Sequence, residues 1–235
     1  GVEDAIYVID RAQKASYLYY TTTAELSHVG DLNCGAYAGS PASMSVARDG
    51  TDSVRYADDT LYAVDLDTMA CRETNYQSNF GHFGMGFAAI DRTGWRDDLF
   101  VANRRHLARL DRQSWTIRTI GELPSQSELT GNKLGQLWAI LPLEQPARLV
   151  QLNKTSARVE RNFNLHGFPE ARSIDTFAFA TWGGDFWLFV RQSGMGNSTD
   201  VYRVTSEGAF SLYEGDTGMD IVGAGVSTCA SSETP

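Results

Sequence analysis

Three carboxylates occupy comparable positions in this 235-residue chain, each at or just before the start of a run of small and apolar residues. They are Glu128, Asp175 and Asp220. Carboxylates that approach one another raise each other's pKa, so that one can donate a proton while another accepts one. Pairs of this kind hydrolyse glycosidic bonds. If the three meet in the fold, Glu128 would be the general acid of a glycoside or ester hydrolase, with Asp175 or Asp220 as its base or nucleophile.

Other motifs that carry chemistry are missing from the sequence. The histidines lack metal-ligand spacing, and no phosphate-binding loop, EF-hand or G-x-S-x-G pattern occurs. Gly84–Ala89 matches the dinucleotide-binding fingerprint in form, but strand patterns rather than a helix follow it. Asp91, Asp97 and Asp98 could together hold Ca²⁺, although an acidic turn is the simpler interpretation. We therefore expect no cofactor and no metal.

A repeat of short apolar runs extends through the whole chain. Each unit has two such runs followed by a polar turn, and the turn residues lie 45, 46, 42 and 52 positions apart. They are Tyr20, Asp65, Asp111, Asn153 and Thr205. Short strands that repeat with a period of roughly 40–50 residues are typical of a β-propeller. We predict an all-β fold for residues 1–235, a single domain that forms a five-bladed β-propeller of four-stranded antiparallel blades.

A run of small or apolar residues precedes each central pair of strands and is expected to form the innermost strand of a blade. These runs are Ser43–Ala47, Gly84–Ile90, Leu129–Leu134, Asp175–Thr181 and Ile221–Thr228. Small residues suit this place because the sheets converge on a narrow axis, whereas glycine elsewhere weakens a strand. The last run has no second strand after it, and the first unit has no inner strand before it. The C-terminal strand should therefore join the N-terminal blade and close the ring.

Residues at the start of the inner strands should line the funnel at the axis, where propellers usually bind their ligands. The predicted ligand-binding set is Ser43, Phe83, Met85, Glu128, Thr130, Asp175, Phe177, Trp182 and Asp220. Trp182 is included because it stands beside a Gly-Gly turn and could offer an exposed ring to a sugar. Tryptophans also fill the wedges between sheets, which is the structural alternative. Short connections between blades predict a shallow funnel, better suited to binding than to chemistry that excludes water.

The three cysteines, Cys34, Cys71 and Cys229, form no C-x-x-C pair, which argues against a zinc knuckle or a thioredoxin-type site. A surface rich in Ser, Thr, Asn and Gly suits an exported protein, in which a disulfide can persist. We predict a Cys34–Cys71 disulfide, with Cys229 buried and free. Three reduced thiols are the alternative.

Composition narrows the range of partners. The formal net charge is −9, and the 20 basic residues form no cluster that would suit phosphate, so nucleic acid is not an expected partner. No apolar stretch approaches the ~20 residues that span a bilayer. A carbohydrate or a surface protein is the partner that remains.

Several stretches resemble a family of uncharacterised exported or lipid-anchored β-propeller proteins of myxobacteria and their relatives. They are Tyr19–Leu26, Phe83–Phe87, Ser127–Gly131, Trp182–Phe189 and Val222–Cys229. The chain departs from the family in having Tyr20 where an Asp is expected, and Lys133-Leu134 in a turn. The resemblance implies a propeller, export and a structural role for at least two cysteines. It implies no activity.

Three functions follow as hypotheses. We favour an exported, non-enzymatic binding or interaction propeller at a bacterial cell surface, with lectin-like carbohydrate binding at the axial funnel as its sharpest form. The alternatives are the hydrolase described above and a self-assembling structural scaffold. We expect the protein to be secreted or held at the cell surface, with a lipid-anchored precursor as one form of the latter. A removed leader would leave no trace in the sequence.

Overall fold

The structure is a computed structural model that describes residues 5–34, 39–48, 51–56, 59–91, 95–194 and 196–230, with the backbone alone for residues 51–56. Nearly all regular structure in these ranges is β-strand, joined by a 3-10 helix at Ala171–Ser173. Within the same ranges, no helix is long and apolar enough to cross a membrane.

The described strands pair into five four-stranded antiparallel sheets. The first contains, in spatial order, β20 (Ile221–Gly225), β1 (Ala5–Asp10), β2 (Ala15–Tyr20) and β3 (Glu25–Asp31). The second contains β4 (Pro41–Val46), β5 (Thr51–Tyr56), β6 (Leu61–Asp65) and β7 (Cys71–Glu73).

The other sheets repeat this up-and-down order. One contains β8 (Gly84–Ala89), β9 (Asp97–Ala102), β10 (His106–Leu110) and β11 (Ile117–Glu122). The next contains β12 (Glu128–Gly131), β13 (Leu137–Leu141), β14 (Ala147–Leu152) and β15 (Val159–Leu165). The last contains β16 (Ile174–Trp182), β17 (Asp185–Gln192), β18 (Asp200–Val204) and β19 (Phe210–Glu214).

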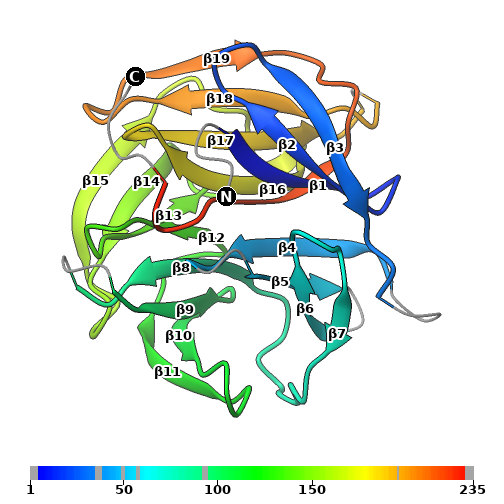
Figure 1. Cartoon of the computed structure of the whole chain (residues 1–235). Coiled ribbons are helices and arrows are strands. Elements are labelled where there is room, and N and C mark those ends of the chain that lie inside the picture. The colour runs from blue at the N-terminus through cyan, green and yellow to red at the C-terminus, as the bar shows by residue number, and fades with distance from the viewer. Residues whose placement is uncertain are drawn as a thin grey trace.

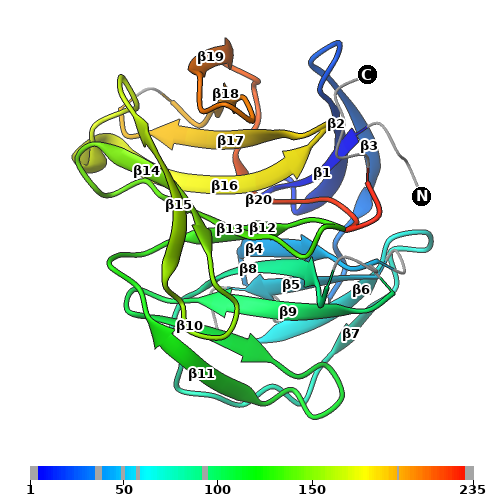
Figure 2. The ribbon, with the colours of Figure 1, turned by 90° about the vertical axis from the view of Figure 1, so that its left-hand side faces the viewer.

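The sheets are arranged around a central axis. Their first strands lie near the middle of the molecule and their fourth strands at the periphery, as Figure 1 shows. The inner strands contact one another in the cyclic order β4, β8, β12, β16, β20 and back to β4. β20 pairs with β1, with Val8 opposite Ala224, and so supplies the inner strand of the N-terminal sheet (Figure 2). The predicted propeller of four-stranded antiparallel sheets, closed by its C-terminal strand, is confirmed.

Glycines in the inner strands let neighbouring backbones approach each other. A Cβ atom on Gly84 would lie 2.5 Å from the carbonyl oxygen of Ser127. One on Gly131 would lie 2.4 Å from the Cβ atom of Ala88. Both distances are too short for real side chains, so β8 and β12 meet backbone to backbone. This contact is the reason for small residues that the sequence predicts.

The turn residues of the repeat join the third strand of a sheet to the fourth. The side-chain oxygens of Asp65, Asp111 and Asn153 each accept backbone N–H groups from the residues two and three positions later. The residue four positions after the turn residue has a left-handed φ in four of the units. These residues are Ala24 (58°), Met69 (56°), Trp115 (55°) and Ala157 (59°). The turn depends on local bonds alone, which is why its period is visible in the sequence.

Tryptophans fill wedges between neighbouring sheets. Trp138 on β13 is 2% exposed, and its ring centroid lies 4.6 Å from that of Phe186 on β17. Trp187 on β17 is 3% exposed and lies 6.4 Å, edge to face, from the ring of Tyr19 on β2. Each such ring removes about 150–250 Å² of surface from water. Trp95, in contrast, is 82% exposed.

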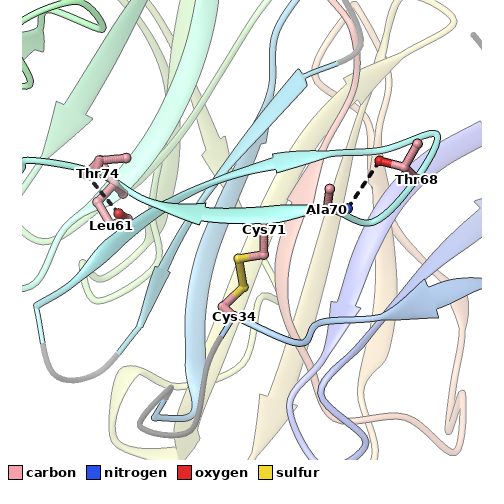
Figure 3. The surroundings of a disulfide bond; sticks show 6 residues. All are labelled: Cys34, Leu61, Thr68, Ala70, Cys71 and Thr74. Atoms are coloured by element: carbon pink, nitrogen blue, oxygen red, sulfur yellow. Dashed lines mark hydrogen bonds between the residues drawn. A yellow bond between two sulfur atoms is a disulfide. The ribbon is translucent and has the colours of Figure 1, made fainter.

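A disulfide joins the segment after β3 to β7, the fourth strand of the next sheet, as Figure 3 shows. Cys34 follows β3 and Cys71 begins β7, and their Cα atoms are 5.1 Å apart. β7 is held in turn by the hydroxyl of Thr74, which donates to the carbonyl oxygen of Leu61 on β6 at 2.8 Å. The predicted pairing is confirmed. Cys229 is free but exposed, so the prediction that it is buried was wrong: it lies in the segment after β20, outside the packed sheets.

Candidate functional site

The three carboxylates of the hydrolase hypothesis gather at one end of the propeller axis. Glu128 is the first residue of β12, Asp175 is the second residue of β16, and Asp220 immediately precedes β20. These inner strands are neighbours in the ring, with β16 in contact with both β12 and β20. Because each sheet follows the same up-and-down path from its inner strand, the starts of the inner strands meet at the same end.

A cavity of about 180 Å³ opens there, and we call it the axial pocket. Glu128 and Asp175 contribute to its wall, together with Arg11, Thr176 and Phe177. The other lining residues are Ser40, Pro41, Ala42, Gln126 and Val222.

Two arginines bind Asp175, in the wall of the axial pocket, and Asp220, which is not part of that wall. Arg11 donates from Nε to Asp220 Oδ2 at 2.9 Å and from Nη2 to Asp220 Oδ1 at 3.3 Å. Arg191 Nη1 lies 2.8 Å from Asp220 Oδ1, and its Nη2 donates to Asp175 Oδ2. The side chains of Arg191 and Asp220 are 8% and 6% exposed. Backbone bonds hold the cluster in place, because the N–H of Arg11 donates to the carbonyl of Asp220 and the N–H of Asp220 donates to Asp10.

This pairing limits what Asp175 and Asp220 can do chemically. A carboxylate that accepts charge-assisted bonds from a guanidinium has its lone pairs occupied by them. An acid–base catalyst instead needs a proton, or a free lone pair, directed at the substrate. Asp220 is buried and bound by guanidinium groups at both oxygens, so it anchors the cluster. Asp175 has a side chain that is 48% exposed and still faces the pocket.

Glu128 reaches past the neighbouring inner strand, β8. Its Oε2 accepts a hydrogen bond from Ser43 on β4 at 3.1 Å, although β4 and β12 are not neighbours in the ring. The strand between them carries Gly84, on which a Cβ atom would lie 2.7 Å from the Glu128 carboxylate. Glycine at position 84 therefore makes room for this carboxylate as well as for the β12 backbone.

Two buried hydrogen-bonding atoms of the β16–β17 hairpin lack a partner within the described part of the chain, and one of them, on Thr176, belongs to the wall of the axial pocket. Thr176 Oγ1 and Arg191 Nε are buried, and neither has a hydrogen-bond partner in the part of the chain that the structure describes. The two residues are directly opposite each other in the β16–β17 hairpin. Buried polar atoms are usually bonded, so Thr176 Oγ1 is a group in this wall that a ligand could satisfy.

Sequence reasoning missed Arg11, Thr176 and Arg191. A signal for the last two was present, because a two-residue Gly183-Gly184 turn pairs Trp182 with Asp185 and, by counting back, Thr176 with Arg191. No comparable signal pointed to Arg11. It is brought to the pocket only when β20 pairs with β1.

The remaining predicted residues lie elsewhere or serve the packing. Phe83 and Met85 belong to the hydrophobic cluster between the β4 and β8 sheets, at 5% and 1% exposure. Trp182 is 5% exposed in the cluster between the β16 and β20 sheets, so its placement does not support a stacking surface for sugars. Thr130 is buried and accepts the backbone N–H of Thr181 at 3.2 Å. Phe177 lines the axial pocket.

The opposite end of the axis has a different character. The segment after β20 lies over it, where the Thr228 hydroxyl donates to Asp97 at 2.7 Å and the N–H of Arg48 donates to the same oxygen at 3.1 Å. A cavity of about 390 Å³ beside this segment has Arg161 as the one charged residue in its wall. Although this cavity is larger, it lacks opposed charges, and we take the axial pocket as the candidate site.

The acidic turn considered for Ca²⁺ has other partners. Asp97 accepts the bonds just described, and Asp98 forms an ion pair of 3.2 Å with Arg109. In the described ranges, no group of three or more His, Cys, Asp or Glu side chains is arranged to hold a metal ion. Residues 92–94 of the same turn lie outside the described residues.

Comparisons with known proteins support the fold. No protein-family model and no curated protein matches the sequence. Among solved structures, the chain is similar to a luciferin-regenerating enzyme, with 12% identity, a TM-score of 0.51, and coverage of 87% of this chain and 75% of that one. It is also similar to a GH43 glycoside hydrolase engineered to display endo-xylanase and exo-arabinofuranosidase activity, with 11% identity, a TM-score of 0.49 and 73% of this chain covered. The match spans only 40% of the hydrolase chain. At this identity, the likeness to the luciferin-regenerating enzyme shows the fold alone.

Proposed function

We propose that this protein is a non-enzymatic binding propeller whose axial pocket holds a small neutral polar ligand, with a carbohydrate as the form we favour. One observation carries the proposal: Arg191 and Arg11 bind the two aspartates on which hydrolysis would depend. The pocket is thereby set up as an array of fixed donors and acceptors. It does not present the opposed acid and base that glycoside hydrolysis requires.

An unpartnered atom in the pocket wall suggests the chemistry of the ligand. Thr176 Oγ1 can both donate and accept. A sugar hydroxyl both donates and accepts, so one such group can satisfy this atom. Phe177 supplies an apolar wall against which the C–H face of a sugar ring can pack. The pocket is small, which favours a single sugar unit over a long chain.

The test is a binding panel of methyl glycosides of common hexoses and pentoses, measured by ligand-observed NMR at millimolar concentrations. Thr176→Val removes the hydroxyl while keeping the shape of the side chain, and should weaken the binding of any sugar that the wild type retains. Thr22→Val, at an exposed position in the turn after β2, is the matched control and should bind as the wild type does. If no member of the panel binds saturably, carbohydrate is excluded as the ligand.

The hydrolase remains as the rival because Glu128 and Asp175 line the same pocket. Its test is turnover of chromogenic glycosides and esters by the wild type and by Glu128→Gln. Turnover by the wild type that the variant loses would favour the enzyme over the binding protein. Equal turnover by both proteins would remove Glu128 from any catalytic role.

We also propose that the protein is exported and acts at a bacterial cell surface. The Cys34–Cys71 disulfide supports this, because disulfides persist in oxidising compartments. Detection of the protein in the cytosolic fraction of its source cells, with both cysteines reduced, would contradict it. Sedimentation over a concentration series tests the scaffold alternative, which requires an assembly larger than a monomer.

A further inference from the structure

A second cavity lies beside the axial pocket. It has a volume of about 660 Å³ and shares Gln126 with the axial pocket, and we call it the rim pocket. Its wall comes from the connection between β7 and β8 and from the turn between β9 and β10. The lining residues are Asn79, Phe80, Gly81, His82, Asn103, Arg104, Arg105, His106, Thr119 and Gln126.

The rim pocket is cationic in an acidic protein. The chain carries a formal net charge of −9, yet the wall of this pocket contains two arginines, two histidines and no carboxylate. Arg104 and Arg105 are exposed, and neither side chain has an acidic partner among the residues that the structure describes. Glu122 stands opposite His106 in the register with β11, but it is not part of the wall. The local field therefore favours an anion where the field of the whole molecule opposes one.

Asn103 holds the two halves of the pocket wall together. Its side-chain amide donates to the carbonyl oxygen of Phe80 at 2.9 Å. Its side-chain oxygen accepts the backbone N–H groups of Arg105 and His106, both at 2.8 Å. The carbonyl oxygen of Arg105 in turn accepts the N–H of Leu123 at 2.6 Å. The backbone that carries the arginines is thus preformed, so binding would pay little for ordering it.

We propose that the rim pocket is a binding site for the oxyanion of a small anionic ligand, a sulfate, phosphate or carboxylate group. The planar guanidinium groups of Arg104 and Arg105 suit such groups because each can donate two parallel hydrogen bonds. Phe80, half-buried in the same wall, offers an apolar surface to the remainder of the ligand. This proposal does not depend on the nature of the axial ligand.

Inorganic sulfate and inorganic phosphate are the first probes, titrated by calorimetry into the full chain in a buffer of low ionic strength. Each arginine removed should weaken binding about tenfold, as expected for the loss of hydrogen bonds to a charged group. Arg104→Ala, Arg105→Ala and the double variant measure this loss. Arg105→Lys keeps the charge but loses the planar guanidinium group with its paired N–H donors. Its affinity for the anion should lie between those of the wild type and Arg105→Ala.

Arg158→Ala is the matched control, because Arg158 is an exposed arginine in the turn between β14 and β15, in another part of the ring. It should bind sulfate as the wild type does. Thermal unfolding of each variant checks that the exposed substitutions leave the fold intact. The proposal is overturned if neither anion binds saturably, or if Arg104→Ala/Arg105→Ala and Arg158→Ala bind equally well.

Two further probes distinguish the source of the oxyanion. Galactose 6-sulfate and glucuronate carry a sulfate ester and a carboxylate on a sugar. If either binds more tightly than inorganic sulfate, and the gain is lost in Thr176→Val, an acidic sugar spans both pockets. If the gain survives in Thr176→Val, the sugar lies within the rim pocket alone. If there is no gain, the free anion is the ligand.

Discussion

The inner and outer strands of this propeller are stabilised in opposite ways. Every residue of β8 and β20 is buried, and β8 packs so closely on β12 that glycine is required at the contact. The outer strand β15 exposes its first four residues, Val159 to Asn162. It is connected to β14 by a turn in which the side chain of Asn153 accepts hydrogen bonds from the backbone of the same turn.

The difference shows where in this fold a charged side chain is costly to hold. A turn such as that at Asp111 forms from neighbouring residues and presents its polar groups to water. At the axis, Arg11 meets Asp220 from 209 positions away, and both are removed from most of their water by the convergence of the sheets. Charge is therefore costly at the axis and inexpensive at the turns, and a charged cluster kept at the axis calls for a functional reason.

Arg191→Ala should have the largest effect on stability. It leaves Asp220 buried with Arg11 as its remaining guanidinium partner, and breaking a buried ion pair costs about 3–5 kcal/mol of the free energy of unfolding. Chemical denaturation measures the loss. Arg109→Ala, which breaks the more exposed pair with Asp98, is the control and should cost at most about 1 kcal/mol. Equal losses in the two variants would contradict the contrast between axis and periphery.

Removal of the disulfide should come next. It closes a separation of 37 residues, and Cys34→Ser/Cys71→Ser should lower the free energy of unfolding by about 2–4 kcal/mol. Reduction of the wild type by dithiothreitol should reproduce the loss in denaturation. Cys229→Ser should have the same free energy of unfolding as the wild type, since this thiol is exposed and unpaired. An effect of Cys229→Ser equal to that of the double variant would contradict the assignment.

Gly131→Ala should destabilise the inner ring by about 1–3 kcal/mol, the usual cost of overpacking. The added methyl group would lie 2.4 Å from the Cβ of Ala88 and 2.5 Å from the carbonyl oxygen of Phe87. Thermal unfolding measures the change. Gly215→Ala is the control, because the nearest atom to its added Cβ is 3.7 Å away. A larger loss at Gly215 than at Gly131 would show that the inner strands are not packed as described.

Acidification should have the smallest effect, and it acts at the outer turns. Hydrogen bonds from Thr68 lower the pKa of Asp65 below its ordinary value of 3.8, and those from Ser114 do the same for Asp111. Because the folded-state pKa is lowered, the turns stabilise the fold above the ordinary value and lose this contribution as the pH falls through the folded-state pKa. The midpoint of acid unfolding measures it.

Asp111→Asn tests this directly, since Asn153 forms the same turn with an amide oxygen. The variant should keep the turn and lose its share of the pH dependence below pH 3.8. Asp67→Asn, an exposed aspartate beside the Asp65 turn, serves as control and should leave the acid midpoint where it is. If Asp111→Asn does the same, the turns do not contribute to the acid response.

Much of the fold could be predicted because its signals are local. The turns repeat in the sequence since each is made by one side chain and the next few residues. The runs of small residues indicate the inner strands because glycine weakens a strand and is rare in strands that are not closely packed against another backbone. The first repeat unit lacks an inner strand and the last run lacks a second strand, and together these two gaps predict the pairing of β20 with β1. The exposure of Cys229 was not predictable, because no pattern indicates how the segment after β20 runs.

The site could be predicted only in part. Glu128, Asp175 and Phe177 reach the axial pocket because the starts of the inner strands converge there. Phe83 and Met85 also stand at or next to the start of an inner strand, β8, but their large apolar side chains are buried between sheets instead.

By itself, the sequence determined the repeat, its turns and the strand that completes the ring, since these follow from contacts within a few residues and from counting units. Tertiary structure alone decided that Arg11 and Arg191 would bind the aspartates, and that Arg104 and Arg105 would share a wall with His82. Arg11 meets Asp220 where β20 pairs with β1, and Arg191 meets Asp220 across the contact between the β16 and β20 sheets. No local pattern encodes the distance between two side chains brought together in this way, and that distance decides whether a carboxylate becomes a catalyst or an anchor.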